Sequence, residues 1–296
     1  MTNLNKGHLA AFSAYAIFGF NIIICKNITT SQYTSSLALF CLRALGATAL
    51  FWFASLFFPK EKIEKEDYVK IFIASFLGLF ITQTSFLEAI EHITPFDCSI
   101  ISTLTPIYTM FIAAIFLKEP ITLKKVVGVL LSFFGILFLI FNGVRNNSGT
   151  TEPIGVILML INGLSFSLYL GIFRPLIAKY SVINFMKWMF LFSLLISLPF
   201  AGKEVFSIHY SELPNLYIGE LLYLIIFSTF IAYFLIPISQ RHLRPTLVGM
   251  YSYVQPIIAT LISIHIGLDT LSWQKIVAAA AVLSGVIIVN NSKSVS

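Results

Sequence analysis

The stretch HITPFDCSIISTLTP, from His92 to Pro106, decides the fold because its framework returns 150 residues later. The second copy is HLRPTLVGMYSYVQP, from His242 to Pro256, and both copies hold a histidine, two prolines and a serine at the same places. A proline inside an apolar helix removes one backbone hydrogen bond and displaces the carbonyl four residues before it. The repeated stretch therefore predicts two broken helices at matching places in a duplicated chain.

The composition around these stretches is that of a membrane protein. Of the 296 residues, 57% are hydrophobic and only 11% are charged, whereas about 25% are charged in soluble domains. Crossing a bilayer takes about 20 mostly apolar residues, and long uncharged windows of this size follow one another along the chain. We expect an all-α polytopic membrane protein with ten transmembrane helices, at residues 8–26, 35–58, 69–90, 97–117, 124–142, 154–173, 182–200, 216–239, 246–267 and 273–290.

The basic residues are distributed unevenly between the two sides of such a bundle. With the N-terminus inside, thirteen lysines and arginines fall in inner segments and four in outer ones. Cytoplasmic loops carry an excess of these residues. The net charge of +6 therefore reflects topology and not a nucleic-acid partner, and we expect both termini in the cytoplasm.

The cysteines and the first apolar run have plain structural explanations. Cys25, Cys41 and Cys98 lie in or beside apolar spans without paired spacing, which predicts small buried side chains and no metal site. The run from Leu9 to Cys25 is followed by KNITTSQY, which has no small-x-small cleavage site. We interpret it as a retained first helix and not as a signal peptide.

The duplication extends beyond the two opening stretches. Laying residues 86–140 over 236–290 without a gap gives nine identities, among them Gly135 with Gly285. An offset of 148 pairs Gly7 with Gly155. Matching prolines and histidines are harder to obtain by chance than matching aliphatic residues, so we interpret the pattern as a repeat.

The repeat divides the chain into two five-helix units. The Asn/Ser/Gly/Thr-rich segment 142–153 has loop composition and marks the midpoint. We expect one unit at residues 1–145 and the other at 153–296. Because five is odd, the second unit enters the membrane from the opposite side, which predicts inverted-topology repeats.

The quoted residues also resemble a known family. Residues 86–139, FLEAIEHITPFDCSIISTLTPIYTMFIAAIFLKEPITLKKVVGVLLSFFGILFL, are similar to the EamA branch of the drug/metabolite transporter superfamily. The resemblance rests on the Ala89-Ile90 pair, the proline-bearing helix, the KEPIT segment and the glycine-containing helix after it. The second half fits more loosely, with LDTLSWQ at 268–274, and AIFGFNIIICK at 16–26 has Phe18-Gly19 where the family often has Trp-Gly.

The resemblance implies a secondary transporter that exports small polar metabolites, amino acids in first place, from the cytoplasmic membrane of a bacterium. Its partners would be the solute and the lipid bilayer. Two alternatives stay open. A lipid-linked sugar flippase predicts a lateral opening between helices, and a non-transporting assembly or receptor protein predicts no continuous polar cavity.

Polar side chains deep in the spans are the candidate substrate-binding residues. As single residues, each is equally well explained as a hydrogen-bonding clasp between helices. As a set, they suit a central cavity that recognises a polar solute. Pro106 and Pro256 are the candidate hinges beside this cavity, and the alternative is that each proline only bends its helix for packing. The candidates are Asn21, Gln83, Ser102, Thr103, Asn162, Tyr169, Tyr233, Ser252, Tyr253 and Gln255.

Four ionisable residues are candidates for gating or coupling. Arg43 lies within a span. The alternative to a role in gating or coupling is that its side chain reaches back to the membrane interface, as we also expect for Lys187. Glu88 lies near an outer helix end, where solvation explains it. His92 and His242 stand at the mouths of the broken helices. They are candidates for proton-sensitive gates because histidine in general changes its charge near neutral pH, and the alternative is that they cap loops.

The sequence lacks the motifs of an enzyme or an ATP-driven pump. It has no His-Glu-x-x-His, no Gly-x-Ser-x-Gly and no glycine-rich phosphate loop with lysine. We therefore expect neither catalysis nor a cofactor.

Overall fold

The first half of the chain is helical, and a π-helix interrupts the run expected at residues 69–90. The computed structural model describes residues 3–31, 33–117, 122–145, 151–243, 245–267 and 272–290. Its elements up to the midpoint are α1 (Asn3–Thr30), α2 (Ser36–Ser55), α3 (Lys65–Ser75), the π-helix η1 (Phe76–Ile81), α4 (Thr82–His92), α5 (Pro95–Ser102), α6 (Thr105–Leu117) and α7 (Leu123–Arg145).

The second half repeats this order and adds three short elements. They are α9, the 3₁₀-helix η2 and the 3₁₀-helix η4. The elements are α8 (Pro153–Ile172), α9 (Arg174–Lys179), α10 (Val182–Ser207), η2 (Tyr210–Glu212), α11 (Asn215–Tyr223), the π-helix η3 (Leu224–Ile231), α12 (Ala232–His242), α13 (Pro245–Met250), η4 (Tyr251–Tyr253), α14 (Val254–His265) and α15 (Trp273–Asn290).

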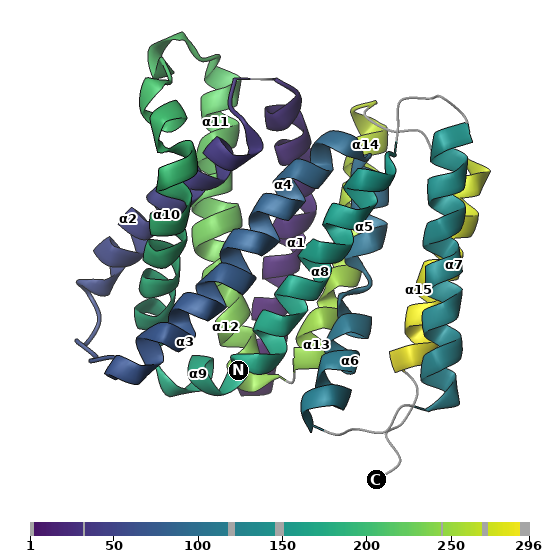
Figure 1. Cartoon of the computed structure of the whole chain (residues 1–296), viewed down its shortest axis with the longest axis horizontal. Coiled ribbons are helices and arrows are strands. Elements are labelled where there is room, and N and C mark those ends of the chain that lie inside the picture. Colours follow the sequence, from purple (N-terminus) through teal and green to yellow (C-terminus); the bar gives the residue numbers. More distant parts are fainter. Residues whose placement is uncertain are drawn as a thin grey trace.

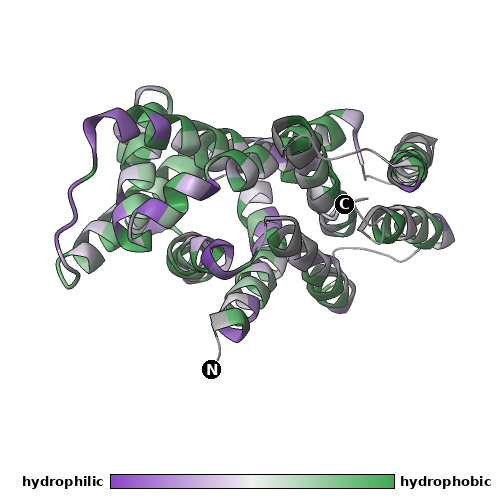
Figure 2. Ribbon diagram, turned by 90° about the horizontal axis from the view of Figure 1, so that it is seen from below, coloured by the Kyte–Doolittle hydropathy of each residue, from purple (hydrophilic) through white to green (hydrophobic). Residues whose placement is uncertain are grey.

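Six helical runs among the described residues are long and apolar enough to cross a membrane. The broken fourth and ninth helices are each divided into shorter pieces, and in the fifth and tenth only the shorter apolar segments Val126–Gly135 and Ile276–Gly285 are found among the described residues, so ten crossings stay a prediction. Apolar residues cover most of the helix surfaces in Figure 2, and the loop between α2 and α3 is hydrophilic. The six runs are Leu4–Thr30, Ser36–Ser55, Lys65–His92, Pro153–Ile172, Val182–Ser207 and Asn215–His242.

The helix breaks occur where the repeated stretches predict them, but one turn earlier than the inner prolines. Thr103 and Leu104 interrupt the helix between α5 and α6, and η4 interrupts it between α13 and α14. Pro106 and Pro256 then lie in the first turn of the following helix, where a missing N–H costs little. The carbonyl of Ser102, which we expected to be free, instead accepts the hydroxyl of Thr105 at 2.7 Å.

Helices α7 and α15 form a closely packed pair at one edge of the bundle (Figures 1 and 2). A Cβ atom on Gly135 would lie 2.9 Å from Cγ2 of Val282 and 3.0 Å from the carbonyl oxygen of Ala278. The hydroxyl of Ser132 donates to the carbonyl of Val282 at 3.1 Å. The two glycines that identify the repeat thus serve the contact between its last helices, because small residues let helix backbones approach in a membrane.

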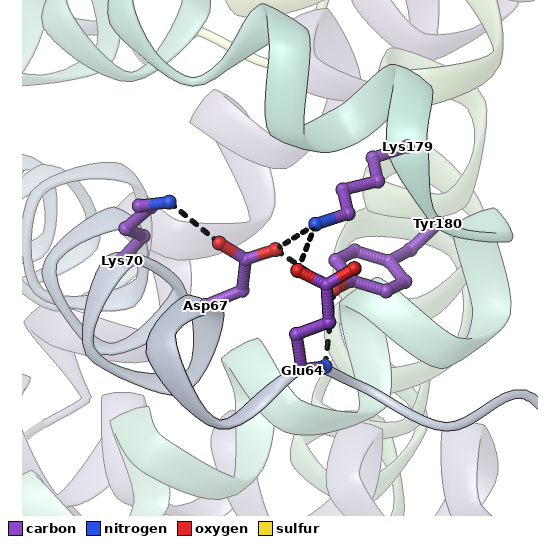
Figure 3. Close-up of polar contacts among 5 residues, drawn as sticks. All are labelled: Glu64, Asp67, Lys70, Lys179 and Tyr180. Carbon is purple, nitrogen blue, oxygen red and sulfur yellow. Dashed lines mark hydrogen bonds and ion pairs between the residues drawn. The ribbon is translucent and has the colours of Figure 1, made fainter.

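An ionic cluster fastens the start of α3 to the segment between α9 and α10 (Figure 3). The carboxylate of Asp67, only 2% exposed, accepts hydrogen bonds from Lys70 Nζ and Lys179 Nζ, both at 2.6 Å, and from Tyr180 Oη at 2.8 Å. Lys179 also contacts Glu64 at 2.6 Å. The carboxylates of Asp67 and Glu64 raise the pKa of the Lys179 amine, so this cation stays charged throughout the physiological range.

We expect Asp67→Asn to loosen this corner of the protein. The change removes the negative charge that three donors share, and charge-assisted hydrogen bonds contribute about twice as much as neutral ones. Because both lysines are partly solvated, we expect a small fall in the melting temperature. Thermal unfolding in detergent measures it. Glu66→Gln, at an exposed neighbouring carboxylate, is the matched control, and equal melting temperatures for the two variants would contradict the assigned role.

Candidate functional site

Side chains from both halves of the chain enclose a cavity at the level of the helix breaks. Its volume is about 70 Å³, room for roughly five water molecules or one small polar solute. The lining residues belong to α1, α2, α4, α5 and α6 in the first half and α8, α12 and α14 in the second. They are Tyr15, Phe18, Asn21, Ile22, Arg43, Thr82, Gln83, Phe86, Ser102, Thr105, Asn162, Phe166, Tyr233 and Gln255.

The cavity brings together six of the ten candidate substrate-binding residues. They come from six different helices and are separated by up to 234 positions in the sequence, so only the packed bundle makes them neighbours. Four of the six side chains end in amides, and the other two, a serine and a tyrosine, carry hydroxyl groups. The six are Asn21, Gln83, Ser102, Asn162, Tyr233 and Gln255.

The other four candidates lie outside the lining. Thr103 is buried and donates to the carbonyl of Ile100 at 2.6 Å, as part of the turn between α5 and α6. Ser252 is buried within η4, and Tyr253 packs against the larger hydrophobic cluster. Tyr169 fills the space beside Gly78, where a Cβ atom would lie 2.5 Å from its ring. These four side chains are not among the lining residues, and the hydroxyl groups of Tyr169 and Ser252 are buried without a hydrogen-bond partner among the described residues. A role for these four in solute binding stays a prediction.

The hinge and gate candidates are separated from one another. Pro256 is buried in α14, and the side chain of Pro106 lies outside the described part of the structure. Glu88 is exposed, as expected for a solvated helix end. His92 Nδ1 lies 2.8 Å from a carboxylate oxygen of Glu152, so it joins the end of α4 to the start of α8.

His242 and Arg43 have different surroundings. His242 is half-buried, and its Cβ atom lies 2.7 Å from the place that a Cβ atom on Gly7 would take. Arg43 is only 2% exposed and lines the cavity, which is contrary to the alternative of a side chain reaching for the interface. Lys187 instead lies over the ring of Trp52, 5.1 Å from its centre, and is not among the lining residues.

Two lining side chains have polar atoms that no described residue satisfies. Gln83, 3% exposed, has neither its amide nitrogen nor its amide oxygen in a hydrogen bond, and the hydroxyl of Tyr15 is likewise unpaired. Buried polar groups are nearly always hydrogen-bonded in folded proteins, and an unpaired one costs about 1–3 kcal/mol. A polar solute in the cavity would supply the missing donors and acceptors.

Matching π-helices, η1 and η3, precede the lining residues of α4 and α12 in the two halves. The hydroxyl of Thr82, the first residue of α4, donates to the carbonyl of Leu77 in η1 at 2.8 Å, and the hydroxyl of Thr229 in η3 donates to the carbonyl of Leu224 at 2.7 Å. Single π-helical turns often occur at functional sites. The sequence analysis did not predict these π-helices. The threonines Thr82 and Thr229, at nearly equivalent positions of the repeat, could have indicated them.

An aromatic wall is the other feature that sequence reasoning missed. The rings of Tyr15 and Phe18 are 5.8 Å apart, and those of Phe18 and Tyr233 are 5.6 Å apart, both edge to face. Tyr233 was already a candidate, but with 29 phenylalanines and 12 tyrosines in the chain no pattern singled out Phe18 or Tyr15 as cavity residues. The cavity therefore has polar groups facing an apolar wall, which suits a small solute with both kinds of surface.

These features define the class of the protein: a polytopic helical membrane protein with a polar cavity between two related halves. The chain belongs to the EamA-like transporter family, whose model matches residues 5–141 and again 153–291. Membership of this family indicates a membrane transporter rather than an enzyme.

Individual relatives agree with this family. The chain is 23% identical to the uncharacterized transporter YetK of Bacillus subtilis, over 95% of this chain and 86% of the relative. It is 27% identical to an uncharacterized transporter of Archaeoglobus fulgidus, over 68% of this chain and 69% of the relative. One crystal structure superposes with a TM-score of 0.66 over 96% of both chains at 17% identity, which shows a shared fold.

Proposed function

We propose that this protein is a secondary transporter that exports small polar metabolites, amino acids in first place, by alternating access. The observation that carries the proposal is the cavity with its unpaired Gln83 amide and Tyr15 hydroxyl. Discontinuous helices at matching places of two repeats are the strongest indication of a binding site in such transporters. In this proposal Asn21, Gln83 and Asn162 bind the solute together with the other lining polar residues.

The contacts at one end of the bundle support inverted repeats. Lys26, near the end of α1, donates to the carbonyl oxygen of Ile90 at 2.7 Å, close to the end of α4. The backbone N–H of Glu152, just before α8, donates to the carbonyl of His92 at 2.9 Å, also at the end of α4. The end of α1 and the start of α8 thus both lie near the end of α4, which supports first helices that run in opposite directions in the two halves.

Reciprocal caps on α2 and α10 support the same symmetry. The carboxylate of Glu204, near the end of α10, accepts the N–H and the hydroxyl of Ser35, both at 2.8 Å, at the start of α2. The carboxylate of Glu61, after α2, accepts the N–H of Ser181 at 2.8 Å, at the start of α10. The same kind of contact, a glutamate that caps the start of the partner helix, thus occurs at both ends of the α2–α10 pair. This symmetry suits a molecule that alternates between two equivalent states.

The bundle's orientation and dimensions complete the proposal. In Figure 1, α1 begins and α15 ends at the same end of the bundle, which supports two termini on one side. The basic loops make that side the cytoplasm, in the inner membrane of a bacterium. A cavity of about 70 Å³ suits a small metabolite better than a lipid-linked sugar, and a purely structural partner has no need of a polar cavity.

Counterflow in proteoliposomes tests the proposal. Purified protein, shown to be monodisperse by size-exclusion chromatography, is reconstituted in liposomes loaded with each unlabelled L-amino acid in turn. We expect accumulation of the matching radiolabelled amino acid for a subset of the panel and none in protein-free liposomes. Folded protein that exchanges no amino acid, sugar or other small metabolite would overturn the transporter proposal.

A further inference from the structure

Arg43 is the largest fully buried side chain of the described structure, and it lines the cavity. Its Nε–H donates to Oγ1 of Thr229 in the π-helix η3 at 2.9 Å, and Nη1 lies 3.8 Å from Sγ of Cys25, a weak acceptor. A guanidinium has five N–H donors and keeps its charge in proteins. Most of the donors of Arg43 are therefore left for another acceptor.

No described carboxylate lies within ion-pair distance of Arg43. The four ion pairs among the described residues all involve other side chains, and Glu220, the acid that contacts α1, accepts the amide of Asn27 at 3.1 Å. Burying a charge without a partner is costly, and a charge inside a membrane protein that faces a cavity marks a solute or ion pathway by default. The hydroxyl of Thr229 carries no charge that could balance the cation.

We propose that Arg43 binds the carboxylate of the transported solute. The proposal rests on the proposed function and narrows its substrate class to small solutes with a carboxylate. A planar guanidinium matches a carboxylate with two parallel hydrogen bonds, which no amide or hydroxyl of the lining can do. The amide of Gln83 then offers a donor and an acceptor to an amino or hydroxyl group, and the ring of Phe18 borders the apolar remainder.

A structural role for Arg43 makes a different prediction. If Arg43 served only to clasp α2 to η3, its contact with Thr229 would be its whole purpose. Thr229→Val would then destabilise the protein as much as Arg43→Gln does. Neither change would alter how the protein discriminates between solutes with and without a carboxylate.

The test compares matched pairs of solutes. Binding to purified protein is measured by calorimetry for L-amino acids, 2-hydroxy acids and the corresponding carboxamides, which lack only the anionic group. We expect wild-type protein to prefer the acids by about 30-fold or more. Arg43→Gln should weaken binding of the acids about 100-fold and abolish the preference, and Arg43→Lys should retain part of it.

Lys187→Gln is the matched control, because Lys187 is a cation within a span but outside the lining. It should bind like wild type, and circular dichroism of each variant verifies folding. Folded Arg43→Gln protein that still prefers acids overturns the inference, as does wild-type protein that binds only solutes without a carboxylate. The latter outcome leaves the proposed transporter intact. Absence of binding and counterflow for every solute overturns the proposed function, and the inference with it.

Discussion

Replacing Gly285 by leucine should lower the melting temperature of the protein by roughly 5–10 °C. A Cβ atom there would lie 2.8 Å from the backbone nitrogen of Ser132 and closer still to the carbonyl oxygen of Gly128. Backbone atoms cannot turn away as a flexible side chain can, so α7 and α15 must separate. Overpacking typically costs about 1–3 kcal/mol, and we expect the upper end of that range, which corresponds to a shift of this size.

Gly219→Leu is the control for this prediction. Gly219 lies in α11, and a Cβ atom there meets nothing within 4 Å. The same substitution should therefore leave the melting temperature unchanged or raise it slightly, since leucine favours helix more than glycine does. Thermal unfolding followed by circular dichroism in detergent measures both variants. Equal melting temperatures would show that the close approach of α7 and α15 is not needed for stability.

Loss of either amide from the cavity should weaken solute binding about tenfold or more. Asn162 and Gln255 line the cavity from opposite halves of the chain, on α8 and α14. A leucine in either place leaves the polar group of a bound solute without its partner, at a cost of about 1–3 kcal/mol. The effect of Asn162→Leu should be the larger, because its amide also donates to the carbonyl of Thr82 at 2.6 Å, at the end of η1.

Gln274→Leu is the matched control for the two amides. It makes the same chemical change on α15, which contributes no residue to the lining. Affinity for the solute identified by counterflow, measured by calorimetry, should stay within about twofold of wild type. If Asn162→Leu and Gln255→Leu also stay within that range, the assignment of the cavity as the solute site is wrong.

The helices and their breaks could be predicted because local physics determines them. A run of about 20 apolar residues needs no partner to form a helix in a membrane. The paired prolines mark the breaks in α5–α6 and α13–α14 within a turn, since a proline disturbs only its own helix. The repeat, with Gly135 and Gly285 at matching positions, could also be predicted from the sequence, because it is a property of the residue order alone.

The composition of the cavity could be predicted only in part. Asn162, Ser165 and Tyr169 follow one another at spacings of three and four residues, so they share one face of α8. That face packs against η1 and the start of α4. Only Asn162 reaches the cavity, because Ser165 donates to the carbonyl of Leu77 and Tyr169 packs over Gly78. Periodicity thus predicts which face of the helix a side chain lies on. It does not predict at which level of that face the neighbouring helices leave space for a cavity.

The sequence by itself determined a duplicated, all-helical membrane protein with broken helices, because hydropathy, charge distribution and proline act within single segments; the number of ten crossings stays a prediction. Only the tertiary structure decided which polar groups meet. Arg43 shows the difference: by sequence it could reach for the interface, but packing against Thr229 in η3 buries it beside the cavity without a carboxylate. The position of a charge relative to its counter-charge depends on several helices at once, and no single segment of the sequence encodes it.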